Sequence, residues 1–269
     1  MITFPNAKIN IGLYITGKRP DGYHNLVSCF FPVPWHDALE IMESSELSFQ
    51  SSGIQIPGSS DHNLCLKAYH LLASDFNIPA VNIHLLKKIP IGAGLGGGSS
   101  DATFTLKACN DLFDLNLEEH QLENYAARLG SDCPFFVKNQ PVIARGTGND
   151  FEATALDLKG KYLAMVNPDM HVSTAEAYGG LIKYSPEPNL QEWLKLPVSR
   201  WQEKIENDFE ISIFAQYPKI AKVKDILYKN GALYASMSGS GATVYGIFEN
   251  EIDLNSFFPK NFEVKAAFI

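Results

Sequence analysis

The stretch PIGAGLGGGSSD, residues 90–101, holds the residue types that point most directly to chemistry. Glycine loses more backbone entropy on folding than other residues, so glycines at this density need a physical reason. A flexible linker would be polar on both sides. This stretch instead follows an apolar, strand-like segment and precedes a helix-like one. The pattern therefore favours a loop that approaches a ligand closely.

Two other phosphate-binding patterns can be compared with this loop. Gly92, Gly94 and Gly97 fit the G-x-G-x-x-G spacing of dinucleotide sites, and Asp111 supplies an acidic residue further on. Pro90 interrupts the junction, however, and the βαβ context of such sites is missing. No Gly-Lys-Ser/Thr follows, which excludes a Walker A loop. A loop of exposed amides that leads into a helix N-terminus remains, and it predicts a phosphate site.

Two serines, Ser99 and Ser100, end the loop. Their hydroxyl groups would lie where a terminal phosphate or its magnesium ion binds. The alternative is that they cap the following helix, and we expect one of them to do only that.

A cation and an amide occur together in NAKINIG, residues 6–12. In an extended strand the apolar side chains share one face, while Lys8 and Asn10 share the other. This places both polar groups on the same side of a strand that should be well buried. A solvated lysine on an edge strand is the alternative.

A turn followed by an aromatic residue and a histidine occurs in RPDGYHNL, residues 19–26. The Pro-Asp-Gly sequence predicts a turn, because proline fixes φ and glycine tolerates positive φ. Tyr23 and His24 could stack on and hydrogen-bond a nucleobase. A tyrosine packed on the surface is the competing interpretation.

Two further stretches complete the set. Asp132, in GSDCPFF, follows a helix terminator and precedes an expected strand, so it is either a turn residue or a general base for a hydroxyl group. General-base catalysis contributes roughly 10²–10⁴ in rate. In SMSGSGATVYG, Gly239 and Gly241 permit either a close backbone approach or a simple hairpin bend.

Hydrophobic spacing predicts the elements that position these residues. Strands are expected at residues 7–16, 26–33, 38–44, 46–52, 80–86, 134–138, 141–145 and 162–168, and in two runs within 232–248. Helices are expected at residues 63–77, 99–113, 118–129, 174–182, 205–216 and 219–229. The order lacks a regular βαβα alternation and predicts an α+β fold, with domains at 1–155 and 156–269.

Composition limits the possible partners. The chain has 269 residues, 45% of them hydrophobic, and a net charge of −8, which disfavours nucleic acid as a main partner. The beginning lacks signal-peptide features, and no apolar run reaches membrane-spanning length. Separated cysteines argue against a zinc site or a disulfide framework. We expect a cytoplasmic protein without a membrane partner. The cysteines are Cys29, Cys65, Cys109 and Cys133.

In this order, the motifs resemble the GHMP superfamily of small-molecule kinases. Residues 90–102 resemble its phosphate-binding second motif, residues 6–13 its first and residues 236–248 its third. The resemblance implies a two-lobed α+β fold. Its N-terminal lobe would resemble ribosomal protein S5 domain 2 and contain a left-handed βαβ unit, and its C-terminal lobe would be ferredoxin-like, with the active site between them.

The sequences AKINIGLYITGKRPDGYHNL and GSDCPFF are most similar to one branch of this superfamily. That branch transfers the ATP γ-phosphate to the 2-hydroxyl of a cytidine-diphosphate sugar alcohol in the non-mevalonate route to isoprenoids. The resemblance implies small-molecule substrates, ATP as co-substrate and Mg²⁺.

The resemblance also implies roles for the acceptor-side residues. Asp132 would be the catalytic base, Lys8 its partner, and Asn10 part of the same pocket. Tyr23 and His24 would hold the cytosine ring. Tyr178 would lie on the other side of that ring, although this position is usually phenylalanine in the family.

On the nucleotide side, Asn63 and Lys87 would contact the adenosine, and the glycine loop would hold the triphosphate. Asp101 replaces a small polar residue of many relatives and must face away from the phosphates or cap the helix. No motif places the magnesium ligands, which stay unknown. The expected ATP-binding loop residues are Pro90, Ile91, Gly92, Ala93, Gly94, Leu95, Gly96, Gly97, Gly98, Ser99 and Ser100.

Two other functions stay open at this point. One is another kinase of the superfamily that acts on a smaller sugar or a mevalonate-like alcohol. The other is a nucleotide-binding regulator without chemistry, in which Lys8 and Asp132 would have no joint role.

Overall fold

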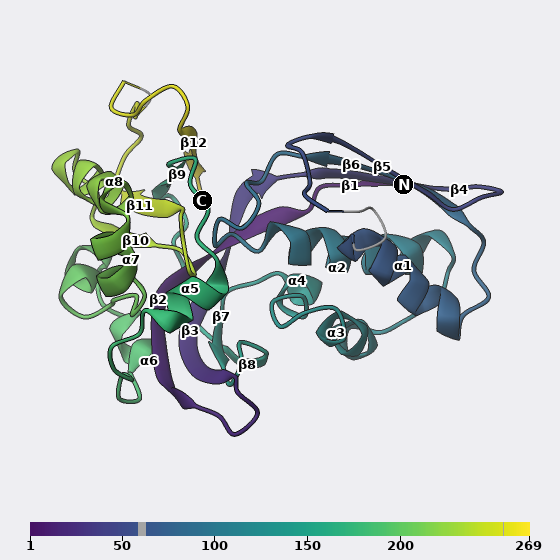
Figure 1. The fold of residues 1–269 in the computed structure, drawn as a ribbon, viewed down its shortest axis with the longest axis horizontal. Coiled ribbons are helices and arrows are strands. Elements are labelled where there is room, and N and C mark those ends of the chain that lie inside the picture. Colours follow the sequence, from purple (N-terminus) through teal and green to yellow (C-terminus); the bar gives the residue numbers. More distant parts are fainter. Residues whose placement is uncertain (59–62, 255) are drawn as a thin grey trace. The chain divides into compact units, whose positions relative to one another are not determined.

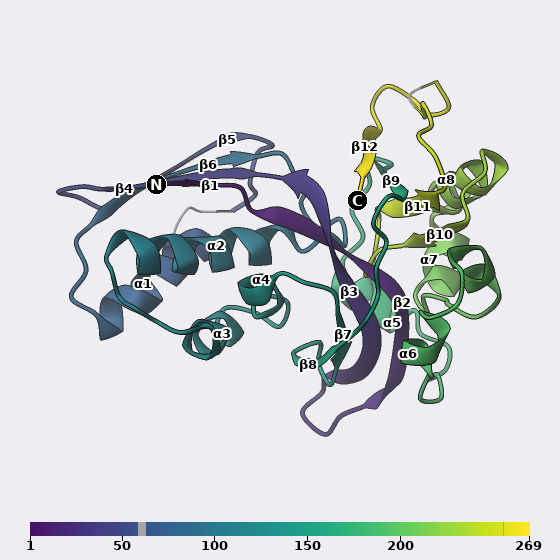
Figure 2. The same ribbon diagram turned by 180° about the vertical axis from the view of Figure 1, so that it is seen from behind.

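The computed structural model describes residues 1–58, 63–254 and 256–269. The chain divides into two compact units, each assembled from separate stretches of sequence. The first unit comprises residues 1–7, 35–91 and 96–140, and the second comprises residues 8–34, 92–95 and 141–269. Figures 1 and 2 show the ribbon from opposite sides. The domain boundary expected near residue 155 stays a prediction.

The first unit contains a four-stranded sheet in the order β1-β4-β6-β5. Strand β6 runs antiparallel to β4 and parallel to β5. Its residues Val81, Ile83 and Leu85 are buried, which confirms the alternation expected from the sequence. The strands are β1 (Ile2–Thr3), β4 (Ala38–Glu43), β5 (Ser48–Gly53) and β6 (Val81–Lys87).

Helices of the first unit cover one face of this sheet, with α1 and α2 side by side (Figures 1 and 2). Leu72 of α1, Leu106 of α2 and Ile83 of β6 belong to one buried apolar cluster. Burial of this face stabilises the unit, because each fully buried large apolar side chain contributes about 1.5–3 kcal/mol. The helices are α1 (Leu64–Asp75), α2 (Gly97–Leu112), α3 (Glu119–Ala127) and α4 (Phe135–Lys138).

The second unit contains two four-stranded sheets, ordered β2-β3-β7-β8 and β10-β11-β9-β12. Every residue of β9 is buried, and β9 pairs antiparallel with β11 and β12. A continuous apolar run, as in this strand, is typical of a strand buried on both faces. The strands are β2 (Asn6–Lys18), β3 (His24–His36), β7 (Val142–Arg145), β8 (Asp150–Ala153), β9 (Tyr162–Asn167), β10 (Tyr234–Met237), β11 (Val244–Phe248) and β12 (Glu263–Phe268).

Helix α8 packs against α7 and against strands β10 and β11. Its buried residues Ile220, Val223 and Leu227 lie three and four positions apart, so they share one face of the helix. The helices of this unit are α5 (Thr174–Gly179), α6 (Leu190–Trp193), the 3₁₀ helix η2 (Val198–Glu203), α7 (Glu210–Gln216) and α8 (Pro218–Lys229).

The strand expected at residues 134–138 is wrong, because this run forms the one-turn helix α4. Phe135, Phe136 and Val137 are all buried, whereas a strand would point neighbouring side chains to opposite faces. Asn139, with φ of 54°, ends the turn, and its amide donates to the Phe135 carbonyl. The mixture of sheets and helices confirms the α+β class.

Two of the expected helices are shorter than their apolar spacing suggests. The one expected at residues 174–182 is α5, and the one expected at 205–216 forms only from Glu210 onward. None of the helices in the described ranges has the length and apolar character needed to span a bilayer.

Candidate active site

The glycine loop adopts a backbone that other residues avoid. Gly92, Gly94 and Gly96 have φ values of 64°, 77° and 67°. These values lie in the left-handed region, which costs glycine little. Helix α2 begins at Gly97, and its N-cap residue Gly96 provides no side-chain cap. The expected capping by a serine is therefore wrong, because both serines lie inside the first helical turn.

The Ser100 hydroxyl is an unsatisfied polar atom in this turn. It is fully buried, and it has no hydrogen-bond partner among the residues that the structure describes. A buried polar group left without a partner costs about 1–3 kcal/mol. The hydroxyl group therefore suits a phosphate oxygen, to which it could donate a hydrogen bond, or a magnesium ion, which its oxygen could coordinate.

The segment 92–95 of the loop lies against the third glycine motif within the second unit. Ser238 Oγ donates to the Gly94 carbonyl at 2.8 Å, and the backbone amide of Asn10 donates to Ser238 Oγ at 3.1 Å. A Cβ atom added to Gly94 would lie 1.9 Å from the Ser238 carbonyl oxygen. This confirms the close backbone approach. Gly239 also belongs to the connection between antiparallel β10 and β11, so the hairpin interpretation holds as well.

Lys87 and two aspartates form a buried ionic cluster at the start of α2, in the first unit. Lys87 Nζ lies 2.5 Å from Asp37 Oδ2 and 2.6 Å from Asp101 Oδ2. Asp101 therefore neither caps the helix nor faces the loop. The nucleotide-binding role of Lys87 stays a prediction, and its ammonium group is held by these carboxylates.

Burial and charge shift the pKa values of this cluster in opposite ways. Burial raises the pKa of Asp101 to about 7, although the Lys87 charge acts to lower it. Burial opposes the charged form of Lys87, yet the two carboxylates raise its pKa above the ordinary value. Lys87 is therefore charged, and it lies beside the carboxyl groups of Asp37 and Asp101.

Lys8 and Asn10 are both buried on β2, so the solvated-edge interpretation is wrong. Lys8 Nζ donates to Asn10 Oδ1 at 2.6 Å, and Asn10 Nδ2 donates to Ser28 Oγ at 2.9 Å. The Lys8 ammonium also lies 4.3 Å from the centre of the Phe30 ring, a cation–π distance. A buried ammonium group held in one direction can act on a developing negative charge.

Asp132 lies in the turn between α3 and α4 of the first unit, and its side chain is half-buried. The Cys133 backbone amide donates to the Gly130 carbonyl at 3.2 Å, which closes this turn. Lys8 belongs to the second unit. The joint action of Asp132 and Lys8 stays a prediction.

The expected base-binding residues come together in part, in the second unit. The His24 and Tyr178 rings stack with centroids 4.7 Å apart, beside a cavity of about 500 Å³. Direct stacking at this separation leaves no space for a third ring between them. Tyr23 is 64% exposed, so its ring is accessible to a ligand. The cavity lining also includes Lys18, Leu181, Lys183 and Tyr184.

The remaining predicted residues have local roles as well. Asn63 is the N-cap of α1, where its Oδ1 accepts a hydrogen bond from the Cys65 amide at 2.8 Å. Pro90 is buried and Ile91 is exposed at the start of the loop. Both residues precede the first left-handed glycine, and their nucleotide contacts stay predictions.

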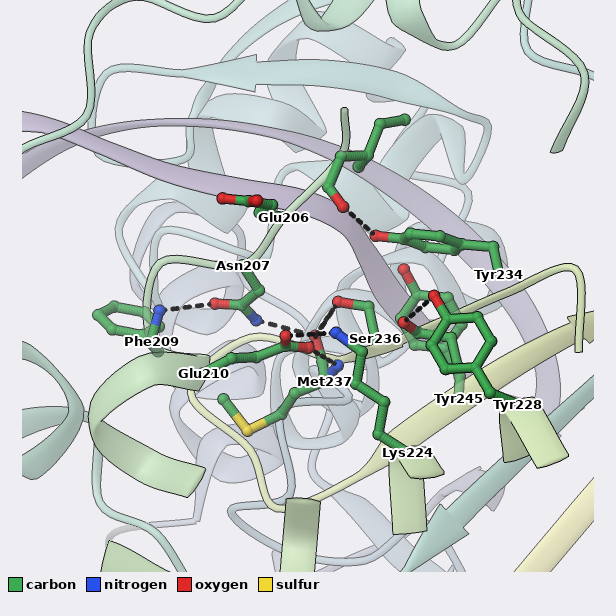
Figure 3. A network of polar contacts seen from close by, with 12 residues as sticks. Glu206, Asn207, Phe209, Glu210, Lys224, Tyr228, Tyr234, Ser236, Met237 and Tyr245 are labelled. Carbon is green, nitrogen blue, oxygen red and sulfur yellow. Dashed lines mark hydrogen bonds and ion pairs between the residues drawn. The ribbon is translucent and has the colours of Figure 1, made fainter. Parts of the chain in front are cut away.

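Sequence reasoning missed two sets of residues. A Cβ atom at Gly92 would lie 2.5 Å from the His171 ring, so this histidine lies against the glycine loop. Asn207 and Glu210 form the polar network around β10 that Figure 3 shows. For Asn207 and Glu210 the sequence signal was the polar and acidic stretch Glu206–Asp208 before an apolar helix, and this stretch fits a helix N-terminus equally well.

Comparison with known proteins supports the order of motifs. The GHMP kinases N terminal domain matches residues 63–140, and the GHMP kinases C terminal domain matches residues 191–260. A 4-diphosphocytidyl-2-C-methyl-D-erythritol kinase of Parabacteroides distasonis is 52% identical over 93% of this chain and 92% of its own length. The kinase of the same name from Bacteroides thetaiotaomicron is 54% identical over 93% of both chains.

Solved structures agree with these relatives. The crystal structure of a 4-(cytidine 5'-diphospho)-2C-methyl-D-erythritol kinase superposes with a TM-score of 0.78 at 30% identity, over 92% of this chain and 90% of that one. A mevalonate kinase superposes with a TM-score of 0.74 at 16% identity, over 99% of this chain and 98% of that one, and shows the fold alone. The domain matches, the close relatives and the glycine loops agree: the chain belongs to the 4-diphosphocytidyl-2-C-methyl-D-erythritol kinase family of the GHMP kinases.

Proposed function

We propose that this chain transfers the γ-phosphate of ATP to the 2-hydroxyl group of 4-diphosphocytidyl-2-C-methyl-D-erythritol, in the non-mevalonate route to isoprenoids. The observation that carries the proposal is the similarity along 93% of the chain to relatives of that name. The buried Lys8–Asn10–Ser28 hydrogen-bond chain and the left-handed glycine loop support a phosphoryl transfer at this site.

The chemistry asks the protein for alignment and charge stabilisation. The Asp132 carboxylate takes the proton of the 2-hydroxyl group, and that oxygen forms a bond to the γ-phosphorus. The bond from the γ-phosphorus to the bridging oxygen breaks, and ADP leaves with the electron pair. The Lys8 ammonium orients the carboxylate and the hydroxyl group and stabilises charge on the transferring group.

The glycine loop holds the triphosphate through the backbone amides of Gly92–Ser100 and through the α2 N-terminus. Mg²⁺ accompanies the phosphates and neutralises part of their charge. The buried, unpartnered Ser100 hydroxyl suits such a hard cation or a phosphate oxygen. Within the described residues no group of three His, Cys, Asp or Glu side chains could hold a metal, so the phosphates would supply most of its ligands.

The cytosine ring binds at the cavity beside His24 and Tyr178. Tyr23, next to His24 in the sequence, has an exposed ring that stacks on the base in this proposal. Polar groups that pair with the base give selectivity, because a base without the matching groups would leave them unsatisfied. Asn63 and Lys87 belong to the adenosine side in this proposal, with Lys87 acting through its backbone because its ammonium group is ion-paired.

The direct test is to measure ADP release by the purified chain with ATP, Mg²⁺ and one of several alcohols. We expect turnover with the cytidyl substrate, and phosphorus NMR of the product should show a phosphomonoester on the 2-oxygen. Mevalonate and a simple sugar alcohol should give rates lower by at least about a hundredfold, since they leave the base site empty. Equal turnover of a smaller alcohol would identify another kinase of the superfamily. ATP binding without any phosphorylated product would identify a regulator.

A further inference from the structure

The segment Asn207–Glu210 follows η2 and ends with the first residue of α7, and it lies against strand β2. The Leu13 amide donates to the Glu206 carbonyl, and the Asp208 amide donates to the Leu13 carbonyl, each at 2.9 Å. These two bonds form an isolated parallel bridge between Leu13 and Asn207. The segment is therefore fixed to the strand that carries Lys8 and Asn10.

The Asn207 side chain uses its amide and its carbonyl group within this fixed segment. Its Nδ2 donates to the Met237 carbonyl at 2.8 Å (Figure 3). It also donates to the Gly239 carbonyl at 2.9 Å. Its Oδ1 accepts from the Phe209 amide at 3.0 Å. Asn207 is 3% exposed, so water does not replace these bonds readily. One side chain thus fixes both ends of the Met237–Gly239 backbone.

Glu210 holds the same strand through the backbone amide of Met237, the residue whose carbonyl group Asn207 binds. Its Oε1 accepts from the Met237 amide at 2.7 Å and from Ser236 Oγ at 3.0 Å. Its Oε2 forms an ion pair with Lys224 Nζ (Figure 3), and the two atoms lie 2.5 Å apart. The ion pair is mostly buried, so Lys224 stabilises the charged Glu210 carboxylate beside β10.

Ser238 transmits this arrangement to the phosphate loop. It lies between the two carbonyl groups that Asn207 holds, and its hydroxyl group contacts Gly94 and Asn10. The Thr243 amide also donates to the Ala93 carbonyl at 3.3 Å. Displacement of the backbone at 237–239 would therefore displace the loop segment 92–95.

Phe209, two positions after Asn207 in the same segment, faces the base-binding side. The Phe209 ring packs edge-on against the Tyr178 ring, with centroids 5.0 Å apart and planes at 78°. Tyr178 in turn stacks on His24. Phe209 is 2% exposed and belongs to the apolar cluster of the second unit, so its ring position is fixed by packing.

We propose that Asn207 and Phe209 are positioning residues with separate targets: Asn207 holds the glycine loop for the ATP phosphates, and Phe209 holds the Tyr178–His24 pair for the nucleobase. The inference rests on the proposed function and extends it to residues that touch neither substrate. Neighbouring residues of one short segment would then control the two affinities independently.

The test uses Asn207→Asp and Phe209→Leu in the full chain. Asn207→Asp keeps the side-chain shape but turns a two-hydrogen donor into an acceptor that faces two carbonyl groups. We expect the dissociation constant and the KM for ATP to rise about tenfold or more, with the KM for the cytidyl substrate changed less than about twofold. Phe209→Leu should raise the KM for the cytidyl substrate about two- to tenfold and leave ATP affinity unchanged.

Matched controls separate positioning from general loss of stability. Asn230→Asp removes the donor that holds the Ile226 carbonyl at the end of α8. Phe258→Leu replaces an aromatic ring by a smaller side chain in the apolar cluster that also contains Phe209. Both should lower the melting temperature without selective loss of either affinity. If Asn207→Asp does not fold, Ser238→Ala removes the next link to Gly94 and should show the same selective loss of ATP affinity.

Parallel loss of both affinities in Asn207→Asp and in Phe209→Leu would overturn the proposal, as would unchanged affinities in both variants. The binding measurements use ATP and CDP as probes in calorimetric titrations. They stay informative whichever alcohol the enzyme phosphorylates. Absence of turnover by the unmodified chain with the cytidyl substrate would instead contradict the proposed function.

Discussion

Ser238 and Gly94 lie 144 positions apart in the sequence, and their backbones meet without space for a side chain. The Ser238 hydroxyl group donates to the Gly94 carbonyl at 2.8 Å, and a Cβ atom on Gly94 would lie 1.9 Å from the Ser238 carbonyl oxygen. The loop segment 92–95 and the third glycine motif therefore form one structural feature of the second unit. Gly94 in the first loop and Gly239 in the other each leave space for the backbone of the opposite loop.

Gly94→Ala should disrupt this contact. An alanine there would require both a left-handed φ of 77° and a shift of the Ser238 backbone. We expect a free energy of unfolding lower by about 1–3 kcal/mol and a much weaker affinity for ATP. Circular dichroism melts and ATP titrations would measure the two effects.

Gly17→Ala is the matched control for this substitution. Gly17 has no positive φ, and no atom lies within 4 Å of a Cβ atom built on it. Its melting temperature and ATP affinity should stay unchanged. Equal behaviour of the two variants would mean that the Gly94 contact does not position the loop.

The buried cluster of Lys87, Asp37 and Asp101 predicts a dependence of stability on pH. Burial raises the pKa of Asp101 to about 7 in the folded chain, above its ordinary value of 3.8. Between these values the folded state binds more protons than the unfolded state, so stability falls as pH rises. One group contributes a slope of at most about 1.4 kcal/mol per pH unit. Urea unfolding from pH 4 to 8 should show this decline.

Asp101→Asn should remove that contribution, because the amide does not titrate. The difference in free energy of unfolding between the two chains should change with pH between about 4 and 7 and level off above. Parallel curves for the two chains would show that Asp101 does not titrate in this range.

The loss of Lys87 should be far more costly than the loss of a surface lysine. Lys87→Met leaves two buried carboxylates without their cation, which costs about 3–5 kcal/mol. Lys195→Met removes an exposed pair with Glu192, worth about 1 kcal/mol or less. Chemical unfolding of the two variants compares them directly. Similar losses would contradict the ionic role of the cluster.

The sequence predicted much of this arrangement, because the relevant patterns are local. The alternating residues of β6 follow from short-range rules. The helix expected at 118–129 forms, but it ends at Ala127 with Arg128 as its C-cap, so Gly130 is not its C′ residue. Residues 134–138 did not follow from such rules, since a short buried apolar run fits a strand or a helix equally well. The Lys8–Asn10 pairing followed from strand alternation, and its burial confirms the favoured interpretation.

Long-range contacts lay beyond such rules. Asp37 and Lys87 are fifty positions apart, and nothing in either local sequence indicates their ion pair. Asn207 contacts Met237 and Gly239, which lie 30 and 32 positions further along the chain, so its role also required the folded chain. Helix α2 begins at Gly97, two residues before the expected start at Ser99, because Gly96 takes the N-cap position that serine often fills.

Tyr23→Ala should separate the two substrates of the proposed reaction. The Tyr23 ring is exposed and close in sequence to His24, so its loss should remove stacking on cytosine, worth about 1–3 kcal/mol. The KM for the cytidyl substrate should rise about five- to a hundredfold, while the KM for ATP stays constant. Tyr23→Phe keeps the ring and should restore the affinity. An unchanged KM in Tyr23→Ala would place the base elsewhere.

The most direct test of the proposed chemistry compares turnover with ATP affinity in Asp132→Asn. The amide keeps the shape of the carboxylate but cannot accept the hydroxyl proton. We expect kcat with the cytidyl substrate to fall by roughly 10²–10⁴, while the dissociation constant for ATP stays within about twofold. A kcat close to that of the unmodified chain, or an equal loss of ATP binding, would contradict the assignment of Asp132 as the base.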